Sequence, residues 1–359
     1  MLKLAKITDK KVTEQELFIG LDVHDKSWNI SVLGKEKEHI KGMTVVPDAK
    51  SLKGLLDRKF VYSKVILAYE AGFCGFSIQR LLSKEGIETI VVNPADIPTR
   101  DKDSKQKTDS HDSLKIAKAL RGGLLEGIYV PTEKEEDEQS VIRYRDILVG
   151  NQSSTKLQIK SYLKKYGIKV PGSNRWGDTF KTRVIASVKE QRPGILFVMQ
   201  GMIEDLNNIE LRIKEAEVEL EKLVKKSEHY ESYKRLTGIP GIGKIVSLTL
   251  IFEIYNIDRF KSTRNFSSYV GLIPTENSSG EKVRKGRMTK RGHRRLKRML
   301  IEASWTAVRR DEAFSNYYKK QLGRSKKAPQ AIVKCAKKLL SRIYHVLKTG
   351  EDYKINFAA

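Results

Sequence analysis

Two aspartates stand three residues apart in the stretch KTDSHDSLKIAKAL, residues 107 to 120, where an apolar pattern with helical spacing begins. Residues three apart on a helix are neighbours on its surface, so Asp109 and Asp112 are expected on one face. One explanation is structural, because aspartates at a helix start cap it and complement its dipole. The other is chemical, because paired carboxylates can bind a cation. The rest of the sequence shows which of these two explanations is favoured.

Two further carboxylates, Asp22 and Glu70, stand at or near the ends of expected strands. LFIGLDV, residues 17 to 23, is an apolar run that contains Asp22, and KVILAYEA, residues 64 to 71, places Glu70 near its end. A carboxylate ending a buried strand is costly unless it is solvated, paired or bound to a cation. If the two strands are neighbours in one sheet, the two carboxylates can meet at one edge.

Four carboxylates at one place would repel one another strongly unless a divalent cation neutralised them. Mg²⁺ and Mn²⁺ prefer hard oxygen ligands, so these two ions are the expected cofactors. Two such ions can clamp the attacking and leaving oxygens in phosphoryl transfer. The acidic residues therefore predict metal-assisted chemistry on a phosphate.

The elements that must position these acids come from the first 130 residues, which alternate between strands and helices. Further strands are expected at 27–33, 43–46 and 89–94, and helices at 49–60 and 76–86. This order predicts an α/β domain with a mixed central sheet.

The rest of the chain has a helical pattern, which predicts an α/β plus α fold. From about 133 the sequence is charged and poor in strands, and from about 231 it is mostly helical, giving expected domains 1–132, 133–230 and 231–359. A heptad seam within the central region indicates either a coiled coil or a helix that packs on its own domain. Its members are Leu206, Ile209, Ile213, Ala216, Leu220 and Leu223.

The composition favours a nucleic-acid partner. Lys and Arg total 69 against 44 Asp and Glu in 359 residues, a net charge of +25. An excess this large is typical of proteins that bind polyanions. No apolar run approaches the roughly 20 residues of a membrane-spanning helix, and no signal peptide is recognisable at the N-terminus. Two cysteines without metal-ligand spacing argue against a zinc site, so a location in the cytoplasm and no membrane contact are expected.

The stretch GIPGIGK, residues 238 to 244, leads into a helix and is similar to a helix–hairpin–helix element. Backbone N–H groups at such a helix start can hold a phosphate. Gly241 and Gly243 would allow the phosphate to approach, and Lys244 would add charge. The alternative is an ordinary turn between two helices.

The segment SSGEKVRKGRMTKRGHRRLKRML, residues 278 to 300, is extremely basic. Even as a solvated basic face it predicts contact with a nucleic-acid backbone. His293 is interpreted as a contact to phosphate or solvent. The basic residues are Lys282, Arg284, Lys285, Arg287, Lys290, Arg291, Arg294, Arg295, Lys297 and Arg298.

Three stretches, GLDVHDKSWNISVL, AYEAGFCGFSIQRLL and KTDSHDSLKIAKAL, resemble the DEDD transposases of bacterial and archaeal insertion sequences. That group includes pilin-gene invertases and bridge-RNA-guided recombinases, and the resemblance covers residues 17–135 and 231–305. It implies an RNase H-like domain, similar to Holliday-junction resolvases, in a bacterial or archaeal protein. It also implies a catalytic, metal-binding role for Asp22, Glu70, Asp109 and Asp112.

The same resemblance implies a nucleophilic serine in the C-terminal domain. Ser279, just before Gly280, matches the serine that becomes joined to DNA, although Ser278 is adjacent. Carboxylate-bound metal would activate the hydroxyl and the arginines would stabilise the phosphate, so the two halves would form one composite site. The family also implies a guide noncoding RNA, and a dimer that pairs into a tetramer on DNA.

The expected function is a DNA transposase or recombinase that cuts and rejoins strands through a Ser279 phosphodiester. One alternative is a hydrolytic, resolvase-like nuclease, in which water attacks and Ser279 only binds phosphate. The other is a non-catalytic nucleic-acid-binding protein with a decayed site. Cleavage with and without Mg²⁺ separates binding from catalysis, and trapping a protein–DNA adduct separates serine chemistry from hydrolysis.

Overall fold

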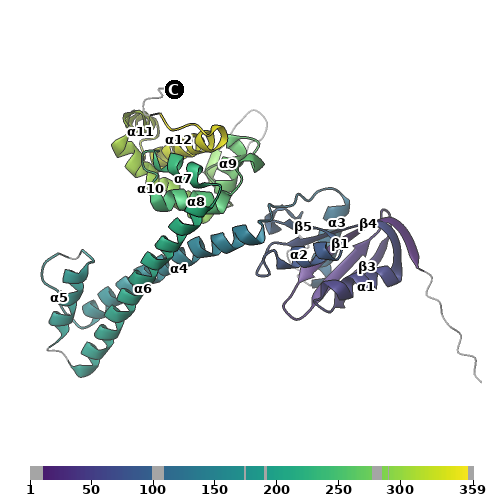
Figure 1. Cartoon of the computed structure of the whole chain (residues 1–359), viewed down its shortest axis with the longest axis horizontal. Helices are drawn as coiled ribbons and strands as arrows, with labels where there is room; N and C mark the ends of the chain where they lie inside the picture. Colours follow the sequence, from purple (N-terminus) through teal and green to yellow (C-terminus); the bar gives the residue numbers. More distant parts are fainter. Residues whose placement is uncertain are drawn as a thin grey trace, which may run out of the picture. The chain divides into compact units, whose positions relative to one another are not determined.

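The computed structural model of the protein describes residues 11–98, 109–173, 175–189, 192–276, 285–289 and 291–354 (Figure 1). For residues 109, 110, 276 and 285–287 it describes the backbone alone. Contacts divide the chain into two units, Met1–Thr132 and Glu133–Ala359. Each unit has hydrophobic clusters of its own.

A five-stranded mixed sheet forms the centre of the first unit, with the strand order β3-β2-β1-β4-β5. The central strand of the first three, β2, is antiparallel to both β1 and β3, whereas β4 runs parallel to β1 and β5 parallel to β4. Their sequences are rich in Val, Ile, Leu and aromatic residues, which favour strands. The sheet confirms the α/β class expected for this region. The strands are β1 (Val12–Val23), β2 (Trp28–Leu33), β3 (Glu38–Val45), β4 (Phe60–Glu70) and β5 (Glu88–Val92).

One face of this sheet is covered by α1 (Ala49–Lys59) and α2 (Ser77–Lys84). Side chains alternate along a strand, so Leu17, Ile19 and Leu21 of β1 all point to this face, and each is fully buried. Burial of one such side chain contributes about 1.5–3 kcal/mol, which makes this cluster the main core of the unit.

The opposite face is covered by α3 (Asp109–Arg121), and a glycine allows a very close approach there. Phe18 packs on this side with Ala117. A Cβ atom added to Gly20 would lie 2.0 Å from the carbonyl oxygen of Ser113 and 2.4 Å from the amide nitrogen of Ala117. The backbone of α3 therefore lies directly on β1.

A buried polar contact fixes α3 to the two neighbouring strands. The Ser113 hydroxyl donates to Oδ1 of Asn29 at 2.8 Å and contacts the Ser31 hydroxyl at 2.9 Å. The amide of Gly42 in turn donates to Oγ of Ser31 at 3.0 Å. Because buried hydroxyls are costly without partners, these bonds specify one position for the helix on the sheet.

The second unit begins with a long helical hairpin. In it α4 (Glu133–Lys165) packs along α6 (Pro193–Lys226), and α5 (Asp178–Val188) packs on α6 (Figure 1). Leu206 and Leu220 of the heptad seam are fully buried against α4 in the same chain. Of the two interpretations of the seam, packing within its own chain is the one that the structure supports.

The remaining elements form a helical body with one small hairpin of strands. Its core contains large side chains such as Phe252 and Phe266, together with the apolar face of the last helix. The mostly helical C-terminal region is therefore confirmed. Its elements are α7 (Tyr230–Thr237), α8 (Lys244–Ile254), α9 (Thr263–Val270), β6 (Pro274–Glu276), β7 (Lys285–Met288), α10 (Arg294–Arg310), α11 (Glu312–Ser325) and α12 (Ala328–Thr349).

Among the residues that the structure describes, none of the helices combines the length and the apolar character needed to cross a bilayer.

Candidate catalytic site and nucleic-acid interface

Asp22 and Glu70 are neighbours at the end of the parallel strand pair β1 and β4. The register aligns Leu21 with Tyr69, so the next residue along each strand is one of the two acids. Both acids belong to the face covered by α3, because Gly20, two residues before Asp22, contacts that helix, and Ala68 packs with it. Adjacent strands lie about 4.8 Å apart, so these two positions adjoin at one sheet edge, as the strand ends predict.

Asp112 reaches the same edge through the polar contact that fixes α3. Asn29 pairs opposite Asp22 in β2, and it accepts the hydrogen bond from Ser113, the residue after Asp112. The Asp112 side chain keeps 22% of its surface exposed and lies 3.8 Å from Nζ of Lys115. The backbone register thus places Asp22 beside Glu70, and Asp112 is next in sequence to the residue that binds Asn29.

Asp109 is the first residue of α3, one turn before Asp112, and its side chain lies outside the described residues. Among the side chains that the structure describes, no three of the types His, Cys, Asp and Glu are grouped closely enough to hold a metal ion. The register supports only the pairing of Asp22 with Glu70, and the metal ligands stay a prediction.

His24 is a polar neighbour of this edge that the sequence analysis missed. Its Nε2 atom lies 3.2 Å from Oδ2 of Asp22, and 45% of its side chain is exposed. The available signal was its position two residues after Asp22, since residues two apart in an extended chain point to the same side. The imidazole can donate a hydrogen bond to the carboxylate.

Much of the basic segment lies outside the described residues. Ser278, Ser279, Lys282, Arg284 and Lys290 belong to that part, and Lys285 and Arg287 are described only by their backbone in β7. Of the others, Arg291, Arg294 and Arg298 are exposed. Lys297 is half-buried and donates to the carbonyl oxygen of Thr289 at 2.8 Å.

A shallow hollow of about 460 Å³ lies beside these arginines, after β7. Its walls combine the positive charges of Arg294, Lys297 and Arg298 with one acidic residue, Glu302, and with apolar side chains such as Met288. Such a mixture can contact both the phosphates and the bases of a nucleic acid. The described part of the basic segment therefore presents a surface suited to a polyanion.

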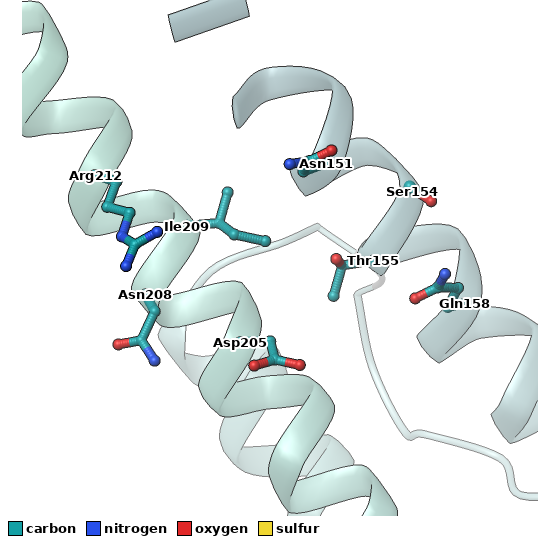
Figure 2. Close-up of a pocket in the computed structure, with 8 residues that line it drawn as sticks. All are labelled: Asn151, Ser154, Thr155, Gln158, Asp205, Asn208, Ile209 and Arg212. Carbon is teal, nitrogen blue, oxygen red and sulfur yellow. The ribbon is translucent and has the colours of Figure 1, made fainter. Parts of the chain in front are cut away.

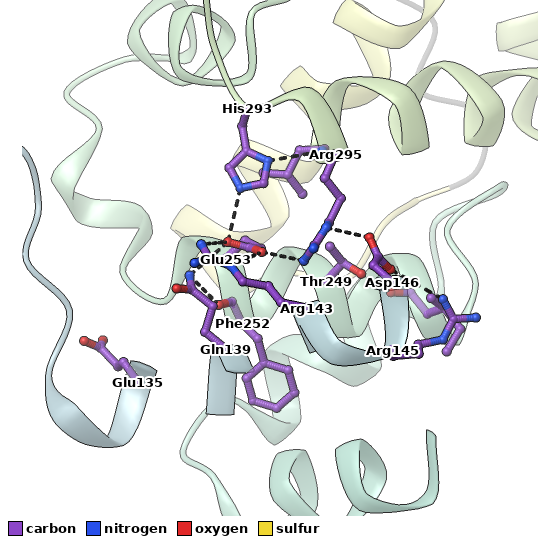
Figure 3. Close-up of polar contacts among 12 residues, drawn as sticks. Glu135, Gln139, Arg143, Arg145, Asp146, Thr249, Phe252, Glu253, His293 and Arg295 are labelled. Carbon is purple, nitrogen blue, oxygen red and sulfur yellow. Dashed lines mark hydrogen bonds and ion pairs between the residues drawn. The ribbon is translucent and has the colours of Figure 1, made fainter. Parts of the chain in front are cut away.

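His293 and Arg295 of the basic segment face the protein interior instead. His293 had been interpreted as a contact to phosphate or solvent, but its Nε2 lies 3.1 Å from Oε2 of the buried Glu253 and its Nδ1 accepts from the Leu296 amide (Figure 3). Arg295 is held between Glu253 and Asp146, at 2.8 and 2.5 Å. The interpretation of His293 is wrong, because both ring nitrogens already have protein partners.

The glycine hairpin between α7 and α8 packs closely against α10. Gly241 has a φ of +89°, and a Cβ atom there would lie 2.4 Å from the carbonyl oxygen of Ala303 in α10. Packing between these helices is by itself enough to require a glycine at this position. Gly243 has open space around it, and Lys244 forms an ion pair with Glu221. Phosphate binding by these residues stays a prediction.

A second hollow, of about 420 Å³, lies between α4 and α6 (Figure 2). Asn151 and Thr155 of α4 and Asp205, Asn208 and Arg212 of α6 are among its lining residues. It interrupts the helical hairpin between the apolar cluster around Leu220 and the one around Leu206. A polar break of this kind fixes the register of two helices, since only one alignment brings the polar groups together.

Comparisons with known proteins relate both units to one group of transposases. A model of the DEDD transposases of the IS110 type matches residues 19–168, and a model of the IS116/IS110/IS902 transposase family matches residues 233–319. The first match contains Asp22, Glu70, Asp109 and Asp112, and the second contains Ser279.

Curated relatives agree with these models. A transposase-like protein of Sinorhizobium fredii is 28% identical over 81% of this chain and 72% of its own length. The transposase of insertion sequence element IS1533 from Leptospira borgpetersenii is 26% identical over 81% of this chain and 85% of its own. The transposase of IS1111A from Coxiella burnetii is 26% identical over 62% of this chain and 60% of its own. Residues 19–168 and 233–319 are therefore similar to two domains of the IS110/IS116 transposases, and the curated relatives are transposases as well.

Proposed function

We propose that this protein is a DNA transposase that cuts and rejoins strands through a covalent bond between Ser279 and DNA, with Asp22, Glu70, Asp109 and Asp112 holding divalent metal. The observation that carries the proposal is the register of β1 and β4, which sets Asp22 beside Glu70 on the face of α3. Each of these acids and Ser279 lies within a matched transposase domain.

The acidic edge fits a hard divalent cation. Its acids belong to two adjacent strands and to the helix that covers them, which supports a shared site once a cation draws the side chains together. Oxygen ligands of this kind suit Mg²⁺ or Mn²⁺. When bound, the cation would stabilise negative charge on the phosphate during transfer. Asn29 and Ser113 keep α3 in place, and with it Asp112.

The serine reaction is a transesterification. Oγ of Ser279 forms a bond to phosphorus, the bond from phosphorus to one deoxyribose oxygen breaks, and the leaving oxygen takes up a proton while the serine hydroxyl loses one. Exposed Arg294 and Arg298 neutralise phosphate charge nearby in the strand. Because one ester replaces another, the reverse attack by a DNA hydroxyl rejoins strands without an external energy source.

The proposal extends to partners that the family resemblance implies. DNA is the substrate, and a structured noncoding RNA guides the choice of site. Exchange of two DNA ends requires two or more copies of the chain, so we propose a dimer that pairs into a tetramer on DNA. Leu206 and Leu220 are buried within one chain, so association has to use other faces of α4 and α6. Exposed apolar side chains there include Leu157 and Phe197.

Single serine substitutions test the proposal. Ser279→Ala should abolish strand cleavage and recombination and leave DNA binding intact, whereas Ser278→Ala should be much milder. The two variants are matched, since they remove the same hydroxyl from adjacent positions. If Ser279→Ala still cuts and produces free ends, water is the nucleophile and the protein is a hydrolytic nuclease.

A further inference from the structure

Glu253, near the end of α8, is a buried carboxylate that binds donors from α4 and from the start of α10 (Figure 3). Its side chain is 1% exposed. Gln139 and Arg143 of α4 donate to it at 2.9 and 3.0 Å, and Arg295 of α10 donates at 2.8 Å. A buried charge is tolerated only with such partners, so this site has been built around the carboxylate.

The contact with His293 joins Glu253 to the beginning of α10. Nδ1 of His293 accepts the Leu296 amide at 3.3 Å and so caps the helix, while Nε2 faces Glu253 at 3.1 Å. An imidazole that accepts at Nδ1 can donate to Glu253 through a proton on Nε2. Glu253 therefore fixes both the tautomer and the orientation of the capping residue.

The start of α10 is in turn fixed to the base of the β6–β7 hairpin. The His293 amide donates to the carbonyl oxygen of Tyr269 at 2.8 Å, and the Thr289 amide donates to that of Ile273 at 3.1 Å. A Cβ atom on Gly292 would lie 2.6 Å from Cα of Gly271, so the two chain segments touch backbone to backbone. Movement of His293 would therefore move the hairpin base.

Through Arg295, Glu253 also fixes the rotation of α10 about its axis. Glu253 and Asp146 hold the guanidinium of Arg295 on the inner side of α10. The helix is thereby prevented from rotating about its axis, and Arg294 and Arg298 stay on the exposed side, at the wall of the 460 Å³ hollow. One buried residue thus controls both the hairpin base and the direction of the basic face.

We propose that Glu253 is a positioning residue for the serine reaction, which acts through His293 and Arg295 to hold the β6–β7 hairpin and the basic face of α10 in the reactive arrangement. This inference rests on the proposed function, because Ser279 lies between β6 and β7 in the sequence. Glu253 itself touches neither DNA nor the nucleophile in this account.

The test compares Glu253→Gln with Glu210→Gln in the full-length protein. Glu210, in α6, is a matched control because it also accepts from several donors, namely Lys181 and Gln152 at 2.5 and 3.1 Å. We would measure the melting temperature, the DNA dissociation constant and the single-turnover rate of the protein–DNA adduct, at saturating DNA and well below both melting temperatures.

We expect Glu253→Gln to slow adduct formation about 10–100-fold, since a misplacement of about 1 Å can cost 100-fold in rate. Its dissociation constant should change less than about threefold. Glu210→Gln should lower stability and keep the wild-type rate. If Glu253→Gln does not fold, His293→Asn replaces it, because asparagine still caps α10 and shortens the link to Glu253. His293→Asn should form the adduct about tenfold more slowly than the wild type. Cooling, which refolds any unfolded protein, should restore little of this rate.

Two outcomes would overturn the inference in distinguishable ways. If the wild type forms the adduct and Glu253→Gln forms it equally fast, or only as slowly as its unfolded fraction explains, the positioning role is wrong. If the wild type cuts DNA without any adduct, the serine reaction itself is wrong, and this role of Glu253 fails with it.

Discussion

Carboxylates occur in two contrasting environments in this protein. Glu253 is 1% exposed and is surrounded by donors from Gln139, Arg143, His293 and Arg295. Asp22 and Asp112 are 23% and 22% exposed, and the register places Asp22 beside another acid, Glu70. The first arrangement uses a carboxylate to hold the protein together. The second leaves the carboxylates partly open to solvent, and in the transposase domains that residues 19–168 resemble, a divalent metal is the expected ligand.

The largest expected effect comes from removing charge at the sheet edge. Asp22→Asn, Glu70→Gln or Asp112→Asn should reduce strand cleavage by about 10³-fold or more, because each removes a metal ligand. DNA binding should be nearly unchanged, and thermal stability should stay the same or rise as repulsion between acids is relieved. The measurement is cleavage of a DNA substrate in Mg²⁺, with the melting temperature of each variant.

Glu38→Gln is the control for the edge acids. Glu38 is a carboxylate in the same unit, but it pairs with Lys118 at 2.7 Å on the surface, so its loss should leave cleavage intact. Full activity of an Asp22→Asn, Asp112→Asn double variant would contradict the assignment of the edge as a catalytic site.

The opposite behaviour is expected of Glu253, whose charge should matter for stability. Burial alone would raise the pKa of its carboxyl, but hydrogen bonds from His293 and Arg143 outweigh burial and lower the pKa from 4.5 to about 2. Because the pKa is lower in the folded state, the ionised carboxyl stabilises the fold at any pH above 4.5, its pKa in the unfolded chain. The contribution is about 3 kcal/mol, and it is lost as the pH falls from about 4.5 to about 2.

Denaturant unfolding of the wild type and of Glu253→Gln between pH 7 and pH 3 measures this contribution. The wild type should lose more stability than the variant as the pH falls, so that the two curves converge in acid. If the unfolding free energies of the two proteins instead fall in parallel with pH, the charge of Glu253 does not contribute to stability.

The smallest expected effect concerns the exposed and inward arginines of α10. Neutralising Arg294 and Arg298 together should reduce the slope of log affinity against log salt by about 2, because each phosphate contact releases about one counterion. Arg295→Gln should leave the slope unchanged and lower stability instead, since Arg295 is already bound to two carboxylates. Equal slopes for all three proteins would mean that this face does not meet the nucleic acid.

The sequence predicted the parts of the fold that depend on local pattern. Asp22 and Glu70 end apolar runs that can only be buried strands, so their placement at strand ends could be expected. The heptad seam was visible as well, but its periodicity says nothing about which helix covers it. Leu206 and Leu220 turned out to pack on α4 of the same chain. The division into three functional regions stays a prediction.

Contacts between distant residues could not be predicted in this way. The partners of Glu253 lie at positions 139, 143, 293 and 295, and no spacing in the sequence connects them. The only hint was a single carboxylate within the apolar stretch LTLIFEI, residues 248 to 254. Similarly, Arg294 and Arg295 are equivalent as letters, yet one is exposed and the other bound to two carboxylates, because a helix turns by 100° per residue.

The most direct test of the central claim is to stop a DNA-cleavage reaction midway with denaturant and to map any DNA-bound peptide by mass spectrometry. The account predicts DNA covalently attached to the peptide that contains Ser278 and Ser279, with the bond at Ser279 and no adduct in Ser279→Ala. Cut DNA with free ends and no attached peptide would contradict the account, and would identify water as the nucleophile.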